Sequence, residues 1–143
     1  MAEVLANRLD ERGDELIVMS GMAEGFDHLL AVTALKLNIP LWCAVPNRGY
    51  GQHYWRKNSL TCRDQYAEFC RLIDAAYRVT YVCSDLYVNG QHSNFVRNSW
   101  MVEQAHEFVV WDPSSRGTAH CVAEISRAGL PSLVLSEGLT PRG

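Results

Sequence analysis

The chain has 143 residues, of which 48% are hydrophobic and 20% are charged, with a formal net charge of −3. This composition is typical of one folded domain with its own core, and the acidic balance disfavours extended DNA or RNA binding, which rests on clustered lysine and arginine. The sequence shows neither an apolar run of about 18 residues nor a secretory signal, so we expect a cytoplasmic protein without a membrane span.

Helical and strand patterns alternate in the first half of the chain. Apolar residues at helical spacing predict a helix over 1–12, and Gly13 is placed to end it. A short apolar strand over 16–19 runs through a glycine-containing turn into a helix over 26–37. After Pro40 we expect a strand over 41–45, then an aromatic loop over 46–58 that lines some site, and an amphipathic helix over 61–75.

The second half continues the same alternation. We expect a strand over 79–83, a polar loop over 84–93 and a helix over 94–104. A strand over 108–111, a helix over 118–128 closed by Gly129, and a strand over 132–135 follow. This order predicts one α/β domain over 1–137 with a mostly parallel sheet, followed by a flexible tail over 138–143. Ligands of such sheets bind at the carboxyl ends of the strands.

The cysteines and histidines give no metal signature. The cysteines are odd in number and form no C-x-x-C pair, so we expect reduced, structural thiols. The histidines lack the paired spacing of zinc sites, and no metal is predicted. These residues are Cys43, Cys62, Cys70, Cys83 and Cys121, and His28, His53, His92, His106 and His120.

The first glycine-containing turn, over 20–27, joins a predicted strand to a helix. Gly21 and Gly25 allow positive φ angles and the close approach of another backbone or a ligand. Asp27 follows them and has two open interpretations, because its carboxylate can accept from a ribose hydroxyl or cap the helix.

The second turn, over 112–118, has the stronger signature of an anion site. Its residues Asp112, Ser114, Ser115, Gly117 and Thr118 follow a strand and open a helix. The N–H groups at a helix start, together with these hydroxyls, favour a phosphate. The turn nevertheless lacks the motifs of a P-loop and of a dinucleotide-binding fold.

Three further residues carry charge or hydrogen-bonding groups that a ligand site can use. Arg97 and Asn98 begin the predicted helix after the polar loop, and either contact a phosphate or have a surface or structural role. Glu124 and Asp27 are the candidate acid or base residues, although such a carboxylate is more often a cap or a solvated group.

Four motifs in this order resemble the YpsA-like branch of the SLOG superfamily, which includes DprA and the LOG phosphoribohydrolases. The resemblance spans 16–135 and rests on S-G-M-A-x-G-x-D after a strand, I-P-L with A-V-P, R-N-S-W-M-V, and V-W-D followed by G-T-A. It implies a Rossmann-like three-layer sandwich that binds a nucleotide or nucleotide-sugar of the ADP-ribose or NAD-derived type. It also implies a homo-oligomer. We expect a sensor or accessory role, with no required cofactor.

The resemblance also assigns the residues of the ligand site. Gly21, Gly25 and Asp27 would border the ligand, and Arg97 would face its phosphate or ribose. The residues that cradle phosphate in the family correspond here to Ser115, Gly117 and Thr118.

Two departures from the family pattern qualify these expectations. LOG hydrolases place acidic residues just after their Gly-Thr pair, where this chain has His120 and Cys121, so an N-glycosidase is the alternative to a binding protein, with Glu124 one turn further on. Relatives also open with a central strand before the helix that starts here at Met1. We therefore expect a sheet without its usual first strand, through truncation, a partner subunit or a shifted strand.

A third class, DprA-like binding of single-stranded DNA, would need a basic groove with stacking aromatics. The sequence offers a small set of such residues, although the net charge argues against this function. They are Tyr50, Tyr54, Trp55, Arg56 and Lys57.

Overall fold

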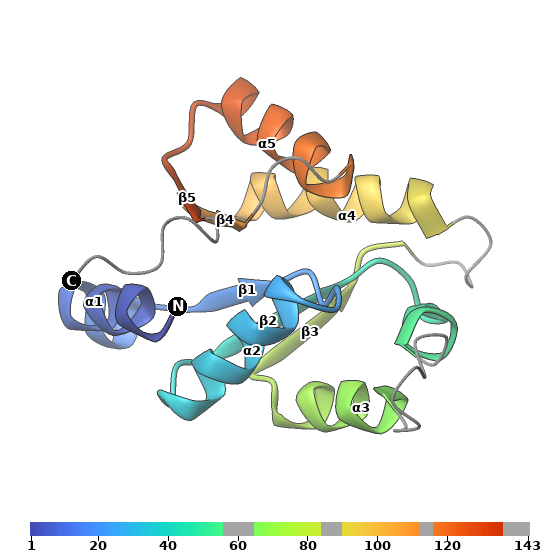
Figure 1. Cartoon of the computed structure of the whole chain (residues 1–143), viewed down its shortest axis with the longest axis horizontal. Helices are drawn as coiled ribbons and strands as arrows, with labels where there is room; N and C mark the ends of the chain where they lie inside the picture. The colour runs from blue at the N-terminus through green and yellow to red at the C-terminus, as the bar shows by residue number, and fades with distance from the viewer. Residues whose placement is uncertain (56–64, 84–89, 112–115, 136–143) are drawn as a thin grey trace.

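Helices and parallel strands alternate along the chain in a mixed α/β fold (Figure 1). The computed structural model describes residues 1–55, 65–83, 90–111 and 116–135. The predicted tail over 138–143 lies outside these ranges. Within them, no helix is both long and apolar enough to cross a membrane.

The elements up to β3 (Arg78–Tyr81) follow the predicted order, and β3 begins one residue earlier and ends two residues earlier than the predicted strand over 79–83. The first strand is shifted toward its carboxyl end relative to the predicted 16–19, and the predicted loop over 46–58 contains a π-helical turn. The elements are α1 (Ala2–Arg12), the 3-10 turn η1 (Gly13–Glu15), β1 (Val18–Ser20), α2 (Phe26–Lys36), β2 (Leu41–Val45), the π-helical turn η2 (Gly51–Trp55), α3 (Gln65–Ala75) and β3 (Arg78–Tyr81).

In the second half, both helices begin earlier than predicted. The helix predicted over 94–104 starts at Gly90, so Arg97 and Asn98 lie beyond its first turn instead of at its start. Its first residues are polar and hide the helical period. The last helix starts at Arg116 instead of residue 118. These elements are α4 (Gly90–Gln104), β4 (Phe108–Trp111), α5 (Arg116–Ala128) and β5 (Ser132–Leu135).

The described strands pair in parallel, as predicted, but they form two sheets instead of one. One sheet has the order β1-β2-β3 and the other pairs β4 with β5. Val18 stands opposite Leu41 in the first sheet, and Phe108 stands opposite Ser132 in the second. No ladder joins β1 to β4 in the described residues, which leaves the sheet interrupted between them.

Helices α2 and α3 cover one face of the first sheet (Figure 1). Alternate residues of β2, Leu41, Cys43 and Val45, are fully buried and belong to one core cluster with Ala34 of α2 and Leu72 of α3. Because side chains alternate across a strand, these β2 residues share one face of the sheet. Burial of apolar surface on this face stabilises the three strands as a unit.

Helix α4 lies against the opposite side of β2. Trp42 of β2 meets Trp100 of α4 edge-to-face, with ring centroids 5.4 Å apart. A second, smaller core cluster joins α4, β4 and α5 through Val102, Phe108 and Ile125. The chain therefore builds one core around each sheet, and the space between the two sheets holds the candidate site.

The aromatic segment over 46–55 contributes more to the core than the sequence predicts. Tyr50 and Trp55 are buried with the first sheet, and Trp55 Nε1 donates a 2.9 Å hydrogen bond to the carbonyl oxygen of Met22. This bond fixes the turn that follows β1.

Candidate functional site

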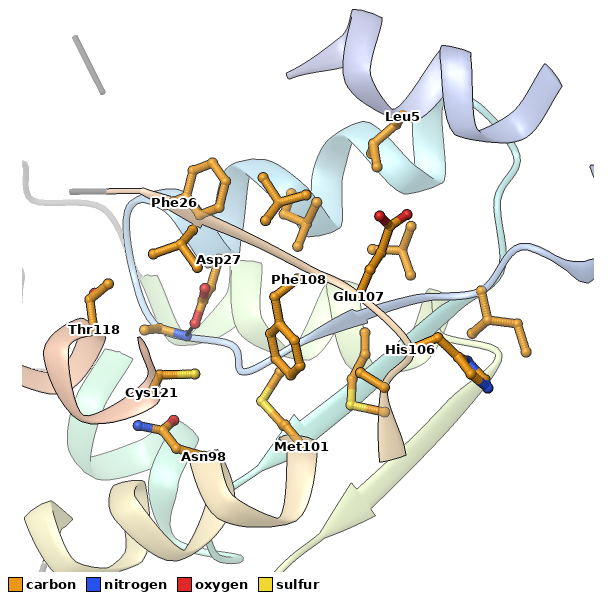
Figure 2. A pocket seen from close by; sticks show the side chains of 18 of the residues that line it. Leu5, Phe26, Asp27, Asn98, Met101, His106, Glu107, Phe108, Thr118 and Cys121 are labelled. Atoms are coloured by element: carbon orange, nitrogen blue, oxygen red, sulfur yellow. Dashed lines mark hydrogen bonds between the residues drawn. The ribbon is translucent and has the colours of Figure 1, made fainter. Parts of the chain in front are cut away.

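A cavity of about 1270 Å³ lies between β1 and β4. Figure 2 shows Asp27, Asn98, Thr118 and Cys121 grouped toward one end of it, with Phe108 nearer the middle. This end of the cavity, called the Asp27 end, lies where β1 and β4 finish, because Asp27 and Thr118 belong to the helices that follow these strands. One end of the cavity thus lies at the carboxyl ends of parallel strands, where the sequence predicts a ligand.

The turn after β1 is held in one conformation by a set of short-range hydrogen bonds. Ser20 Oγ donates to the carbonyl oxygen of Asp27 at 2.9 Å and accepts from the N–H of Met22 at 3.2 Å. The N–H of Ala23 donates to Asp27 Oδ2 at 3.3 Å. Gly25 has a φ of 89°, a conformation that favours glycine. These features fix the Asp27 carboxylate beside the cavity.

Arg97 connects this turn to α4. Its side chain is buried, with Nη1 donating to the carbonyl oxygen of Gly21 and Nε donating to Asn98 Oδ1 at 3.1 Å. A Cβ atom on Gly21 would lie 3.1 Å from both Arg97 Nη1 and Asp27 Oδ2. The lack of a side chain at Gly21 is therefore what lets the guanidinium and the carboxylate approach the same point.

Burial changes the acid–base properties of two groups at the Asp27 end of the cavity. Loss of water raises the pKa of Asp27, while the positive charge of Arg97 and the N–H of Ala23 oppose the rise. Burial and the nearby Asp27 raise the pKa of Cys121 to about 11. The Cys121 thiol is therefore protonated at neutral pH and is a poor nucleophile there.

A further set of polar side-chain contacts connects α4 to α5. Asn98 Nδ2 lies 3.4 Å from His120 Nδ1, and His120 Nε2 lies 3.6 Å from Glu124 Oε1. The His120 ring also stacks on Phe95, with centroids 4.2 Å apart. Glu124 Oε1 receives Arg127 Nη2 at 2.7 Å. Glu124 thus contacts side chains of its own helix, α5. It is not among the described residues that line the cavity.

The predicted site residues are distributed as follows. Gly25, Asp27, Arg97, Asn98 and Thr118 line the cavity, and Gly21 contributes the carbonyl that Arg97 binds. Gly117 lies in the first turn of α5. The remaining members of the predicted phosphate cradle, Asp112, Ser114 and Ser115, lie outside the described residues.

Sequence reasoning missed several cavity residues that helical spacing could have found. Asn94 and Met101 lie three or four positions from the predicted residues Arg97 and Asn98, which places all four on one face of α4. Asn94 Oδ1 is buried and accepts no hydrogen bond from the described residues. Cys121 follows Thr118 by three positions on α5 and lines the cavity with it.

These features define a mixed α/β protein with a polar site at the carboxyl ends of parallel strands. No protein-family model and no curated protein matches the sequence. Membership of the SLOG superfamily therefore stays a prediction. In the described part of the chain, no group of three or more His, Cys, Asp or Glu residues is placed to hold a metal ion.

Proposed function

We propose that this protein binds a nucleotide or nucleotide-sugar, of the ADP-ribose or NAD-derived type, in a sensor or accessory role. The observation that carries the proposal is the buried Arg97 held beside Asp27 in a large cavity at the strand ends. A buried cation with several donors suits a phosphate, and a fixed carboxylate suits the hydroxyls of a ribose.

The start of α5 supports phosphate binding at this end of the cavity. Thr118 lies in the first turn of this helix and lines the cavity. The first N–H groups of a helix have no partner within the helix, and the positive end of the helix dipole favours an anion. Arg97 adds a full positive charge on the same side of the site.

Other residues that line the cavity can contact the rest of the ligand. Phe26, Met101 and Phe108 offer apolar surface to a base. The buried Oδ1 of Asn94 can accept from an amino or hydroxyl group of the ligand, which would satisfy an acceptor that the described residues leave without a partner.

The arrangement of strands also supports a Rossmann-like three-layer sandwich of the SLOG type. Every described strand pair is parallel, and α2 and α4 contact opposite sides of β2 through the core cluster and the Trp42–Trp100 pair. Sheets of this type place nucleotides at the carboxyl ends of their strands. We also propose a homo-oligomer, which light scattering would test.

Calorimetric titration with ADP-ribose, NAD and AMP tests the proposal. We expect saturable binding by at least one of them, and weaker binding by about tenfold or more in Asp27→Asn, because a charge-assisted hydrogen bond is lost. Asp10→Asn is the matched control, since Asp10 is exposed on α1. Absence of binding by the folded protein to all three ligands would overturn the proposal.

An N-glycosidase remains the second candidate, because Asp27 lines the cavity and its raised pKa suits a general acid. In this reaction Asp27 would protonate the departing base while water attacks the ribose C1′. Chromatography of AMP, NAD and ADP-ribose after incubation tests it. Released base that disappears in Asp27→Asn but persists in Glu124→Gln would support this chemistry, and intact substrates would exclude it.

A further inference from the structure

A series of polar groups connects Arg97 on α4 to the side chains of α5. Arg97 Nε donates to Asn98 Oδ1 at 3.1 Å, and Asn98 Nδ2 lies 3.4 Å from His120 Nδ1. On the other side of the ring, His120 Nε2 lies 3.6 Å from Glu124 Oε1. Asn98 lines the cavity, whereas His120 is not among the described residues that do so. His120 therefore reaches the candidate site through Asn98.

The chemistry of Arg97 sets the direction of the bonds in this series. A guanidinium has donors and no acceptor, so the Asn98 atom that faces it must be the amide oxygen. The Asn98 nitrogen, which is a donor, then faces His120 Nδ1, and this nitrogen can accept only when it carries a lone pair. In that neutral ring the proton lies on Nε2, toward Glu124. The contacts thus require a neutral His120 in one defined tautomer.

Stacking holds the plane of the His120 ring. The ring lies on Phe95 of α4, with centroids 4.2 Å apart and planes inclined by 13°. A half-turn of the ring would keep this stacking, but it would place a carbon atom opposite Asn98 instead of a nitrogen. The ring therefore offers Asn98 an acceptor only at Nδ1.

Protonation of His120 removes this acceptor, because it adds a donor at Nδ1. Asn98 then stands between two donors, Arg97 Nε and His120 Nδ1, with one oxygen that can face only one of them. The positive ring is attracted instead to Glu124, which also binds Arg127. Histidine is the side chain that ordinarily changes its charge between about pH 5 and 8.

The charged groups near His120 act on its protonation in opposite directions. Glu124 on α5 and Asp27 on α2 favour a positive ring, whereas Arg97 on α4 and Arg127 on α5 oppose it. Asp27 and Arg97 are close enough to act on the thiol of the next residue in the sequence. Because Asp27 titrates as well, a pH effect is assigned to His120 only where a variant of this residue removes it.

We propose that His120 is a positioning residue of the candidate site. In its neutral form it holds the Asn98 amide in the orientation that binds Arg97. On protonation this bond is lost, so the guanidinium keeps its contact with Gly21 but is no longer fixed for an anionic ligand. The effect on ligand affinity rests on the proposed function, whereas the coupling of His120 to Arg97 does not.

Two substitutions separate the acceptor at this position from its titration. His120→Asn brings an amide oxygen close to the position of Nδ1, so it keeps an acceptor for Asn98 but cannot take up a proton. His120→Phe keeps a ring that can stack on Phe95 but has no acceptor. His92→Asn is the matched control, because His92 is exposed in the first turn of α4.

Nitrogen NMR of the ligand-free protein tests the coupling to Arg97. At about pH 8 we expect the His120 signals of a neutral ring with its proton on Nε2. As the pH falls to about 5, the Arg97 Nε–H signal should shift with the midpoint of the His120 ring. This shift should be absent in His120→Asn and kept in His92→Asn. A neutral ring with its proton on Nδ1, or an Arg97 signal with the same pH dependence in the original protein and His120→Asn, would overturn the proposal.

Calorimetric titration with ADP-ribose, whose diphosphate keeps its charge over this pH range, tests the effect on affinity. From about pH 8 to about pH 5, we expect the original protein to lose about fivefold more affinity than His120→Asn, the factor that one hydrogen bond contributes. At about pH 8, His120→Phe should bind more weakly than His120→Asn by about the same factor.

The outcomes of the two experiments separate this proposal from the proposed function. If ADP-ribose binds with the same pH dependence to the original protein and to His120→Asn, His120 does not position the site. If ADP-ribose binds to neither at any pH, the proposed function and the effect on affinity are both wrong. The NMR titration then still decides whether His120 positions Arg97.

Discussion

Arg97 donates a hydrogen bond to the carbonyl oxygen of Gly21, which joins α4 to the turn after β1 across 76 positions of sequence. Gly21 provides the acceptor and, by having no side chain, the space that the guanidinium occupies. The Asp27 carboxylate also lies close to the position that a Gly21 side chain would occupy. The geometry of the candidate site therefore depends on a residue that contributes only its backbone carbonyl and the absence of a side chain.

Gly21→Ala tests this dependence. The new Cβ would lie 3.1 Å from both Arg97 and Asp27, so one of them must move. We expect a loss of about 1–3 kcal/mol in the free energy of unfolding, measured with urea, together with weaker nucleotide binding.

Gly129→Ala is the control for this variant. Gly129 closes α5 with a φ of 69° and has open space around its Cβ position, so alanine costs about 1–2 kcal/mol through backbone strain alone. Nucleotide affinity should be unchanged in this variant. If both variants lose stability and both keep their affinity, Gly21 does not shape the site.

Arg97→Lys tests the geometry of the buried cation. Lysine keeps the charge but lacks the planar fork that reaches Gly21 and Asn98 together, so at least one acceptor loses its partner. We expect a destabilisation of about 1–3 kcal/mol by urea denaturation. Arg71→Lys, at an exposed position of α3, should have little effect. Similar free energies of unfolding for the two variants would show that stability does not require the planar guanidinium group of Arg97.

The raised pKa of Asp27 predicts a pH dependence of stability. The folded protein binds the Asp27 proton more tightly than the unfolded chain, whose carboxyl titrates near 3.8. The contribution of Asp27 to the free energy of unfolding is therefore fully present below pH 3.8. It is lost as the pH rises through the pKa of Asp27 in the folded protein. Asp27→Asn does not titrate and should lack this decline.

Urea denaturation across this pH range measures the effect. We expect the free energy of unfolding of the original protein, relative to Asp27→Asn, to fall with rising pH and then level off. A rise of this difference with pH would mean that the pKa of Asp27 is lowered in the folded protein, and that Arg97 outweighs burial.

The Cys121 thiol offers a chemical probe of the cavity. Its pKa of about 11 predicts slow alkylation by iodoacetamide at neutral pH in the folded protein, and faster reaction after denaturation in urea. Peptide mapping by mass spectrometry would measure the rate at Cys121 separately from those of the other cysteines. A bound nucleotide should slow the reaction further, since Cys121 lines the cavity. Alkylation equally fast in folded and unfolded protein would contradict this placement.

Much of the fold could be predicted from local patterns. The strands over 41–45, 108–111 and 132–135 have the predicted bounds, because each is a short apolar run. Gly13 and Gly129 end their helices as predicted, both with positive φ. The start of α4 could not be predicted, since its polar first turn shows no apolar period.

Some residues that line the cavity could be named from the sequence, but their contacts could not. The glycine-containing turn, Arg97 and Thr118 were identified from sequence, yet the bond between Arg97 and Gly21 depends on how distant elements pack. The interruption of the sheet between β1 and β4 could not be predicted either. Each strand has a partner on its other edge, and whether the two strands also pair with each other depends on tertiary packing. The involvement of Asn94 and Cys121 follows from helical spacing only once one cavity residue on each helix is known.

A crystal structure of the protein soaked with ADP-ribose tests the central claim most directly. We predict that the diphosphate lies at the start of α5 near Thr118 and Arg97, with ribose hydroxyls donating to Asp27. Density for the ligand outside this cavity, or an empty cavity in crystals grown with saturating ligand, would contradict the proposed function.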